Sequence, residues 1–546
     1  MREILVIGSG IAGMTAAIMC AEQGMHVTLV SPFPSERSQS VMAAGGINAV
    51  LKNNDQGDSV ESHIEDTING GCGIAGRDSV EGLCRGAEDI IGILEKCGAV
   101  FTRTPGGKIA TRNFGGQSHK RTCYCGTSTG KQIVTALVME TRRFESQGLI
   151  ERKLWHDFHS ALIKDGVCYG ALLYDEASRS LEPIYADAVI VATGGQNAIF
   201  GKTTGSTQCD GYTAGRLFMQ GAELKNLEFI QYHPTTIETP QKRMLVSEAA
   251  RGEGGRLFYI NDGERIYFME DKYGSRGNLM TRDVVSREIY DAGSQVYLDV
   301  SFLDSKLIDE RLPEIKDICS KYIGLDISKE PVPVSPSVHF FMGGLAVHDD
   351  HQTNIRNLYA VGECASKYHG ANRLGGNSLL AAIYSGATAA EAINKAETGE
   401  ENIRPDFKAY IDAEVSALEK SMASMSSFPV MYVRDMLAEN MNRDLGIVRD
   451  EESLDQGIKE IDYYLSICDQ IKYDSSVLPY FNYSLKGILV LARAVMTSAK
   501  ERRESRGAHY RSDFPNTDDN QAYSSIISYD DGKYNVRLDK ENAYES

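Results

Sequence analysis

The chain has 546 residues, enough for about three domains at roughly 100–200 residues each. It carries 57 Lys and Arg against 75 Asp and Glu, a net charge of −18, which argues against a protein that binds nucleic acid. Its 11 cysteines are scattered and include no C-x-x-C pair, which disfavours a disulfide framework and a metal or iron–sulfur ligand set and favours reduced thiols in a cytoplasmic protein.

The first predicted element is a buried strand over Ile4–Ile7, and it leads directly into a glycine-rich turn. Gly8, Gly10 and Gly13 form a G-x-G-x-x-G pattern, and a helix-like segment follows over Met14–Glu22. In this setting Gly8 allows the tight turn, Gly10 lets the main chain approach a pyrophosphate, and Gly13 lets helix and strand pack closely. The chain therefore begins with a dinucleotide-binding unit.

The second predicted strand, His26–Val30, bears on which dinucleotide binds. It ends in Ser31 and Pro32, so no Asp or Glu follows it to accept a hydrogen bond from a ribose hydroxyl. This disfavours NAD, whereas FAD can use an acid that comes later in the chain.

The later elements predict the domain order. Residues 1–225 alternate strand-like and helix-like segments, and further apolar strands lie within 186–195 and 357–362. Short strands within 226–349 indicate an inserted domain, so residues 1–225 and 350–400 would form one discontinuous domain. Amphipathic patterns over 401–515 predict a helical domain, and the polar residues 516–546 predict a tail. No apolar run is long enough to cross a membrane, and the early first strand leaves no room for a secretion signal.

Nine motifs, taken together and in order, resemble the flavoprotein subunit of the succinate dehydrogenase/fumarate reductase family, of which L-aspartate oxidase is a relative. The resemblance runs from residue 1 to about residue 515. The motifs are Ala44–Ile47, Phe114–Gln117, Ala192–Gly195, Gln231–Pro234, Glu248–Gly254, Arg282–Arg287, His339–Gly344, His369–Gly375 and Glu504–His509.

The resemblance implies an α/β fold: a Rossmann-like FAD-binding domain with an inserted α+β capping domain and a C-terminal helical domain. It implies FAD, with the pyrophosphate on Gly8, Gly10 and Gly13. Other positions that match FAD-binding residues of the family are Ser38, Ser40, Gly45, Gly46, Asp210, Glu363, Asn377, Ser378 and Leu379. Glu363 is expected to replace the acid that is missing after the second strand.

The resemblance also implies a C4 dicarboxylate substrate, which needs cationic and hydrogen-bonding groups at both ends. The matching positions are His233, Ser247, His339 and Arg373. Reduction of its C=C bond needs a hydride from flavin N5 and a proton from the opposite face.

The family's proton donor is an arginine, which matches Arg282 here. An arginine is a poor acid, with a pKa above about 12, so it must be reprotonated through a relay. Glu248 and Arg251 match that relay, and Asp283 would support it.

Two positions depart from the family pattern. Gln39 stands where many relatives carry the histidine that links FAD covalently, and an amide cannot form that bond. We therefore expect tight but non-covalent FAD and a preference for fumarate reduction over succinate oxidation. Phe114 stands where aspartate oxidases carry a Glu that can meet the substrate's ammonium, which favours a plain dicarboxylate and assigns Phe114 to the substrate pocket.

The leading hypothesis is a fumarate reductase-type flavoprotein on the cytoplasmic side, which takes electrons from an iron–sulfur subunit and meets a membrane only through its partners. The second hypothesis is a free-standing L-aspartate oxidase that produces iminoaspartate. The third is a flavin-bearing electron carrier without dicarboxylate chemistry, and His233, Arg282, His339 and Arg373 together argue against it.

Overall fold

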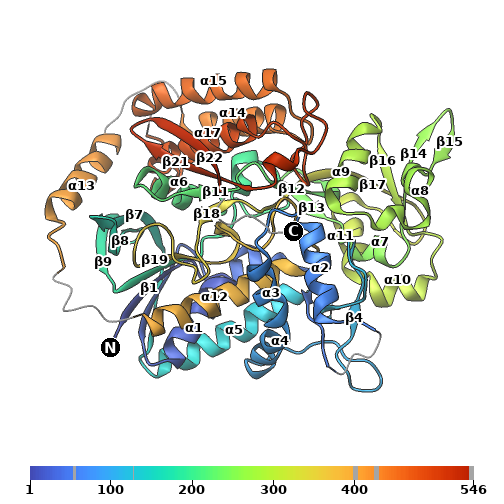
Figure 1. Ribbon diagram of the computed structural model, residues 1–546, viewed down its shortest axis with the longest axis horizontal. Helices are drawn as coiled ribbons and strands as arrows, with labels where there is room; N and C mark the ends of the chain where they lie inside the picture. The colour runs from blue at the N-terminus through green and yellow to red at the C-terminus, as the bar shows by residue number, and fades with distance from the viewer. Residues whose placement is uncertain (53–56, 127, 397–403, 423–428, 472, 540–546) are drawn as a thin grey trace.

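A five-stranded parallel sheet, which we call the central sheet because both of its faces are buried, contains the strands β1 and β19 labelled at the lower left of Figure 1. The computed structural model describes residues 1–546 except 53–56, 127, 397–403, 423–428, 472 and 540–546. The strands of the central sheet, in spatial order, are β19 (Leu358–Ala360), β10 (Ala188–Val191), β1 (Glu3–Ile7), β2 (His26–Ser31) and β6 (Ile150–Leu154).

Both faces of this sheet are buried, which explains why β1 is apolar at every position from Ile4 to Ile7. Ile4 and Val6 belong to the core under the helices, and Leu5 and Ile7 belong to the core on the other face. The helices of the first face are α1 (Ile11–Glu22), α5 (Thr129–Ser146) and α12 (Asn377–Lys395). Against the second face packs an antiparallel sheet of β7 (His156–Lys164), β8 (Val167–Asp175) and β9 (Ser180–Tyr185).

The region that follows the first part of the nucleotide-binding domain contains a six-stranded antiparallel sheet, seen at the right of Figure 1. Its strands, in spatial order, are β13 (Arg243–Leu245), β12 (Ile230–Glu238), β17 (Val332–Phe341), β16 (Val296–Asp299), β14 (Arg256–Asn261) and β15 (Glu264–Ile266). Its helices are α7 (Ala249–Gly252), α8 (Phe268–Tyr273), α9 (Arg282–Asp291), α10 (Ser305–Arg311) and α11 (Pro313–Ile323). These elements are the inserted α+β part expected from the sequence, and we call them the cap.

Helices dominate the chain after α12. They are α13 (Lys408–Met422), α14 (Val430–Asp444), α15 (Glu451–Ile467), α16 (Pro479–Tyr483) and α17 (Leu485–Glu501). The nearly fully buried α17 packs against α15 and against α6 (Tyr212–Met219), which joins this region to the nucleotide-binding domain. Among the described residues, no helix is long and apolar enough to cross a membrane.

The expected C-terminal tail is wrong for residues 524–539. This segment forms a hairpin of β21 (Ser524–Asp530) and β22 (Lys533–Asp539), and β21 pairs with β11 (Leu224–Lys225). The same mixed sheet contains β18 (Gly344–Ala346) and β20 (Ala365–Ser366). The sequence contains a signal for this hairpin, because Asp-Gly is a typical two-residue hairpin loop. In the structure Asp531 and Gly532 form that loop, and both have positive φ, 43° and 84°.

Three short helices and a small sheet lie next to α12. The helices are α2 (Val60–Gly70), α3 (Arg77–Arg85) and α4 (Ala87–Lys96), and the sheet is built from β3 (Ile47–Asn48), β5 (Thr122–Cys123) and β4 (Thr111–Arg112).

Candidate active site

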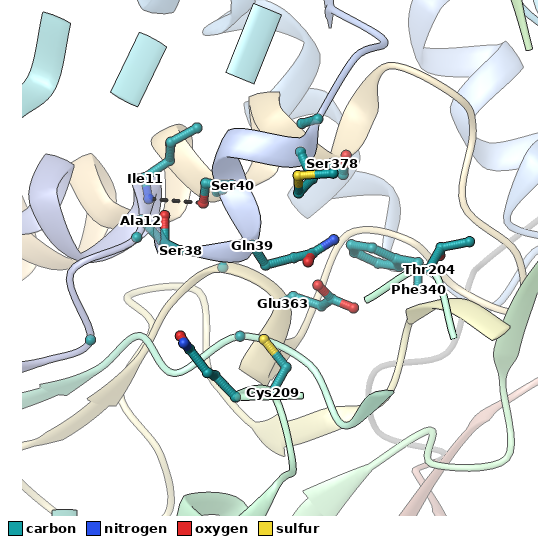
Figure 2. Close-up of a pocket in the computed structure, with 18 of the residues that line it drawn as sticks. Ile11, Ala12, Ser38, Gln39, Ser40, Thr204, Cys209, Phe340, Glu363 and Ser378 are labelled. Carbon is teal, nitrogen blue, oxygen red and sulfur yellow. Dashed lines mark hydrogen bonds between the residues drawn. The ribbon is translucent and has the colours of Figure 1, made fainter. Parts of the chain in front are cut away.

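One long cavity joins the carboxyl ends of the parallel strands to the cap, the location at which open α/β sheets bind their ligands. Figure 2 shows part of its lining, including Ser38, Gln39, Glu363 and Ser378. The predicted residues that line it are Gly8, Gly10, Ser38, Ser40, Gly45, Gly46, Phe114, Asp210, His233, Ser247, Glu248, Arg282, His339, Glu363, Arg373, Ser378 and Leu379. The predicted residues outside its lining are Gly13, Arg251, Asp283 and Asn377.

Two glycines of the turn after β1, Gly8 and Gly13, lie too close to the main chain for any side chain. Gly8 has a φ of +109°, and a Cβ there would lie 2.3 Å from the Ala192 carbonyl oxygen. A Cβ on Gly13 would lie 1.8 Å from the carbonyl oxygen of Gly8, so the first turn of α1 rests directly on the strand end. Gly10 faces the cavity beside Ser40, whose hydroxyl accepts the Ile11 N–H at 3.2 Å (Figure 2). The N-terminus of α1 therefore faces the cavity through Gly10, with the Ser40 hydroxyl beside it, as a pyrophosphate site requires.

Polar atoms without partners surround the same cavity. Ser38 Oγ, Gln39 Oε1 and Arg373 Nε are buried and have no hydrogen-bond partner within the part of the chain that the structure describes. Buried polar groups normally have partners, so these atoms fit a ligand with phosphate, hydroxyl and carbonyl groups. The residues present thus suit FAD, with the glycine turn for its pyrophosphate and the unpaired side chains for its polar groups.

Glu363 lies just after the end of β19, and its carboxylate accepts the Phe341 N–H at 3.0 Å. Burial raises the pKa of this carboxyl to about 7, despite the Phe341 hydrogen bond and the charge of Arg373. Because β19 and β2 lie on opposite sides of β1, Glu363 does not take the place of an acid at the end of β2. That part of the prediction was wrong, since the order of strands in a sheet is not visible in a sequence.

Asp210 is also on the cavity wall. Its Oδ1 accepts the Tyr212 N–H at 3.0 Å and the Tyr480 hydroxyl at 2.8 Å, and Arg434 lies 3.5 Å from Oδ2. Burial raises the pKa of Asp210 in spite of these partners. Tyr480 and Arg434 belong to the C-terminal helices, so their contacts with Asp210 connect these helices to the cofactor cleft.

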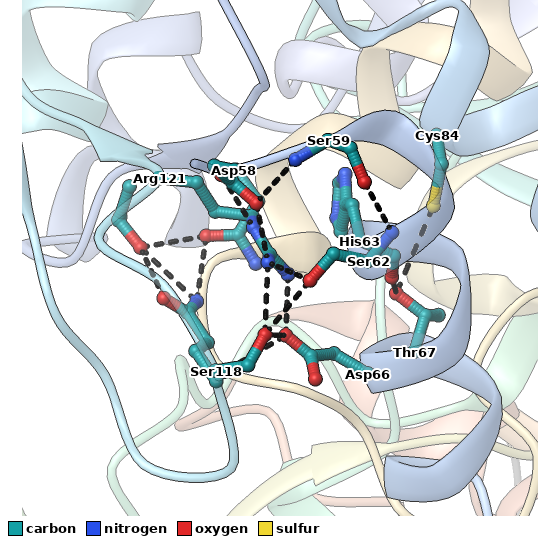
Figure 3. A network of polar contacts seen from close by, with 12 residues as sticks. Asp58, Ser59, Ser62, His63, Asp66, Thr67, Cys84, Ser118 and Arg121 are labelled. Atoms are coloured by element: carbon teal, nitrogen blue, oxygen red, sulfur yellow. Dashed lines mark hydrogen bonds and ion pairs between the residues drawn. The ribbon is translucent and has the colours of Figure 1, made fainter. Parts of the chain in front are cut away.

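Asn377 matches an FAD-binding position of the family, but its side chain does not line the cavity. It accepts hydrogen bonds from Asn48 at 2.8 Å and His63 at 3.1 Å and donates to Thr67 at 3.0 Å. His63 and Thr67 lie on α2, next to the ion network that joins Arg121 to Asp58 and Asp66 (Figure 3). The hydrogen bonds of Asn377 hold the first residue of α12 in place. The next two residues of α12, Ser378 and Leu379, line the cavity.

Glu248 is the centre of a buried chain of charges under the cap. Its Oε2 accepts Arg282 Nε at 3.0 Å and lies 2.9 Å from Nη2, its Oε1 accepts the Gly115 N–H at 2.8 Å, and Arg251 Nη2 lies 3.5 Å away. Burial favours the neutral acid, but the charges of Arg282 and Arg251 and the Gly115 hydrogen bond outweigh it, so the pKa of Glu248 is lowered. Arg251, Glu248 and Arg282 therefore form a continuous chain that ends at the cavity.

Gln231 is a site residue to which the sequence reasoning gave no role. Its Oε1 accepts Arg282 Nη1 at 3.1 Å and Arg373 Nη2 at 3.0 Å, and its Nε2 donates to Asn372 at 2.7 Å. Asn372 in turn donates to Asp283 at 2.7 Å, so Asp283 reaches the two arginines only through two amides. Gln231 lies in one of the family motifs, and its position two residues before His233 on β12 was the available signal.

His233 on β12 and His339 on β17 lie next to each other on two paired strands of the cap, with ring centroids 5.2 Å apart. His339 Nδ1 lies 2.8 Å from the Thr204 hydroxyl. Burial, reinforced by the charge of Arg282, lowers the pKa of both rings well below 6.5. At neutral pH both are uncharged hydrogen-bonding groups, and the positive charge of the pocket comes from its arginines.

Positive charge is concentrated around Glu248 and Gln231. The buried guanidinium groups of Arg251 and Arg282 share the single carboxylate of Glu248, and the buried Arg373 shares only the amide of Gln231 with Arg282. Burial, and after it the charge of Arg282, lowers the pKa of Arg373 well below 12.5, although Glu363 and Glu248 act in the opposite direction. An arrangement of this kind is suited to a small dianion.

Phe114 and Ser247 complete the pocket. Phe114 is buried, and a Cβ on Gly45 would touch its ring at 3.2 Å. The Ser247 hydroxyl accepts the Ala249 N–H at 3.3 Å and remains on the cavity wall.

Comparison with known proteins identifies the family. The model of the FAD binding domain matches residues 3–379, and the model of the fumarate reductase flavoprotein C-term matches residues 434–544. The succinate dehydrogenase flavoprotein subunit of Bacillus subtilis (strain 168) is 40% identical over 541 residues, which cover 95% of this chain and 92% of that protein. A fumarate reductase (CoM/CoB) subunit from Methanothermobacter marburgensis is 37% identical over 532 residues, covering 94% and 95%. A solved structure of E. coli quinol fumarate reductase superposes with a TM-score of 0.87 at 29% identity, covering 98% of this chain and 96% of that one.

The cleft and these matches define an FAD-dependent oxidoreductase. More particularly, the chain belongs to the succinate dehydrogenase/fumarate reductase flavoprotein family.

Proposed function

We propose that this protein is a fumarate reductase-type flavoprotein subunit that converts fumarate to succinate. The observation that carries the proposal is the buried group of Arg282, Glu248, Gln231 and Arg373, which brings two guanidinium groups to one cavity and holds them by a shared amide. The family relationship supplies the redox class, and this arrangement supports the choice of a dianionic substrate.

Binding of the dicarboxylate is assigned to Arg373, His233, Ser247 and His339. Arg373 has a planar fork suited to a bidentate carboxylate contact, and its Nε is the unpaired buried donor described above. The neutral histidines and the Ser247 hydroxyl donate hydrogen bonds without adding charge. Phe114 occupies the part of the cavity wall where an amino-acid substrate would need a partner for its ammonium group. This favours a dicarboxylate without an ammonium group over an amino acid.

Arg282 is assigned as the proton donor to the substrate carbon. Glu248 holds it through Nε and Nη2 and Gln231 holds it through Nη1, so the guanidinium plane is fixed at the cavity. When bound and reduced, the flavin would supply the hydride. Arg282 gives its proton to the substrate carbon and takes one back through Glu248, whose carboxylate passes on a proton received from the side of Arg251 and, beyond it, from solvent. Asp283 supports the arginines through Asn372 and Gln231. Because the arginines are already in place, the negative charge that develops on the substrate is stabilised without rearrangement.

FAD is proposed to be bound without a covalent link, because Gln39 offers an amide where the family's linking histidine would stand. Gln39 lines the cavity, so the substitution lies in the cofactor cleft itself (Figure 2). Precipitation with trichloroacetic acid is expected to leave the yellow flavin in the supernatant, and yellow colour retained in the pellet would contradict this assignment.

The electron donor is proposed to be an iron–sulfur subunit on the cytoplasmic side. The relatives named above are themselves subunits, which supports this view. Among the described residues, no group of three or more His, Cys, Asp or Glu side chains is placed to hold a metal ion. We also propose three functional domains: a discontinuous FAD-binding domain of residues 1–225 and 350–400, a capping domain of residues 226–349, and a helical domain of residues 401–515. The capping domain supplies most of the groups that bind the substrate.

The test is steady-state reduction of fumarate by a reduced viologen dye, with crotonate as the matched substrate that lacks one carboxylate. Loss of one charge-assisted contact is worth about 1.5–3 kcal/mol, so kcat/KM for crotonate is expected to be about 10–150-fold lower. Equal turnover of both acids, or no turnover of fumarate, would contradict the proposal.

A further inference from the structure

Two strands of the central sheet end side by side at one corner of the cofactor cleft. β2 and β6 are paired in parallel with Ser31 opposite Leu154. Phe33 follows the end of β2 by two residues, and Trp155 follows β6 directly. Their rings meet edge to face, with centroids 6.1 Å apart and planes at 79°.

Phe33 lines the cavity together with Pro32 and Pro34. In this fold the chain just after the second strand meets the adenosine ribose, while the glycine turn receives the pyrophosphate. The Ser31 hydroxyl is already used, because it donates to the Phe33 carbonyl at 2.6 Å and accepts the Phe33 N–H at 3.3 Å. The end of β2 therefore offers an aromatic ring to this part of the cavity.

Trp155 is held in an unusual position behind Phe33. It has a φ of +65°, a left-handed conformation that bulky residues rarely adopt, and its side chain is 47% exposed. Its carbonyl accepts the Glu176 N–H at 3.0 Å, and the next three residues, His156, Asp157 and Phe158, all line the cavity. Strained backbone of this kind persists where the surroundings fix it and gathers at ligand clamps.

We propose that Phe33, supported by Trp155, forms an aromatic clamp for the adenosine half of FAD and so supplies affinity that a covalent flavin link would otherwise provide. Phe33 contacts the adenosine, and Trp155 is a positioning residue that keeps the Phe33 ring at the cavity wall. Stacking of a base on an aromatic side chain changes affinity by about tenfold to a hundredfold. The inference rests on FAD as the cofactor and is independent of the proposed substrate and direction.

The test compares three ligands on the full-length protein depleted of FAD, by titration calorimetry. FAD carries both halves, ADP carries only the adenosine half, and FMN carries only the flavin half. The variants are Phe33→Ala, Trp155→Ala and the conservative Trp155→Phe. Tyr463→Ala is the matched control, because Tyr463 is 55% exposed and makes a similar edge-to-face contact with Tyr464 at 6.0 Å, away from the cavity lining.

Phe33→Ala is expected to weaken FAD and ADP by about tenfold or more and to leave FMN within about twofold of the unsubstituted protein. Trp155→Ala should weaken FAD and ADP less, Trp155→Phe should restore most of the loss, and Tyr463→Ala should change nothing. Unchanged FAD affinity in Phe33→Ala, or an equal loss for FMN, would overturn the proposal.

A second measurement needs no variant. Trp155 is the single tryptophan of the chain, so its emission reports on this corner alone. ADP does not absorb tryptophan emission, so a change on adding ADP reports contact at this corner rather than energy transfer to a flavin. ADP is expected to change the fluorescence of Trp155, and an unchanged emission on adding ADP would overturn the clamp. Neither readout involves fumarate, so failure of the clamp and failure of the proposed reaction would be seen separately.

Discussion

Replacing Arg282 with lysine tests the assigned proton donor while keeping the positive charge. Arg282 contacts Glu248 from Nε at 3.0 Å and from Nη2 at 2.9 Å, and it contacts Gln231 from Nη1 at 3.1 Å. One ammonium group cannot span both partners, so at least one charge-assisted hydrogen bond of about 1.5–3 kcal/mol is lost. Loss of a positioned acid lowers kcat by about 10²–10⁴-fold, or about 3–5 kcal/mol of barrier.

Binding of the dicarboxylate should change far less than kcat, because Arg373 and the net charge of the pocket remain. The assay is fumarate-dependent oxidation of reduced viologen, with the Kd of succinate measured from the flavin spectrum. Arg265→Lys is the matched control, since Arg265 pairs with Asp299 at 2.8 Å on the cap surface and lies outside the cavity. A lysine variant at 282 with kcat within about threefold of the unsubstituted protein would refute the assignment.

Three further predictions follow from the same geometry. Gln231→Leu leaves N–H groups of two buried arginines without an acceptor, so kcat/KM for fumarate should fall by about 10–100-fold, and an unchanged value would remove Gln231 from the site. Glu363 has a pKa raised from 4.5 to about 7, so the folded FAD-free protein keeps a proton that the unfolded chain releases; the contribution of Glu363 to the free energy of unfolding should fall by about 3 kcal/mol between pH 4.5 and 7, and in denaturant titrations the Glu363→Gln variant should gain about that much relative to the unsubstituted protein over this range, whereas a difference that does not change with pH would contradict the assignment. Phe114→Glu should allow L-aspartate to reduce the flavin, and continued inertness toward L-aspartate would show that this position does not select the substrate.

The local sequence pattern and the order of the motifs predict the individual elements and the family of this protein. They do not predict how elements far apart in the chain are arranged relative to one another. The strand Ile4–Ile7, the glycine turn and α1 are visible in the sequence because neighbouring residues define them. Glu363 was assigned to the wrong end of the cleft because strand order depends on contacts between residues far apart in the chain. The hairpin around Asp531-Gly532 was missed because overall polarity outweighed a clear turn signal.

The side-chain network of the site shows the same limit. A motif places Gln231 near His233, but only the folded chain shows that its amide joins Arg282 to Arg373. In the same way, Asn377 belongs to a matching position, yet its side chain is committed to Asn48, His63 and Thr67. Hydrogen-bond partners are set by tertiary packing, so they cannot be read from a single sequence.

The central claim, that this flavoprotein reduces fumarate, is tested most directly by a single-turnover experiment. The flavin of the purified protein is reduced anaerobically and mixed in turn with fumarate and with oxygen, and the oxidised protein is mixed with L-aspartate, while flavin absorbance is followed. We predict fast reoxidation by fumarate, slow reoxidation by oxygen and no reduction by L-aspartate. Fast reoxidation by oxygen together with reduction by L-aspartate would contradict the account and identify an L-aspartate oxidase.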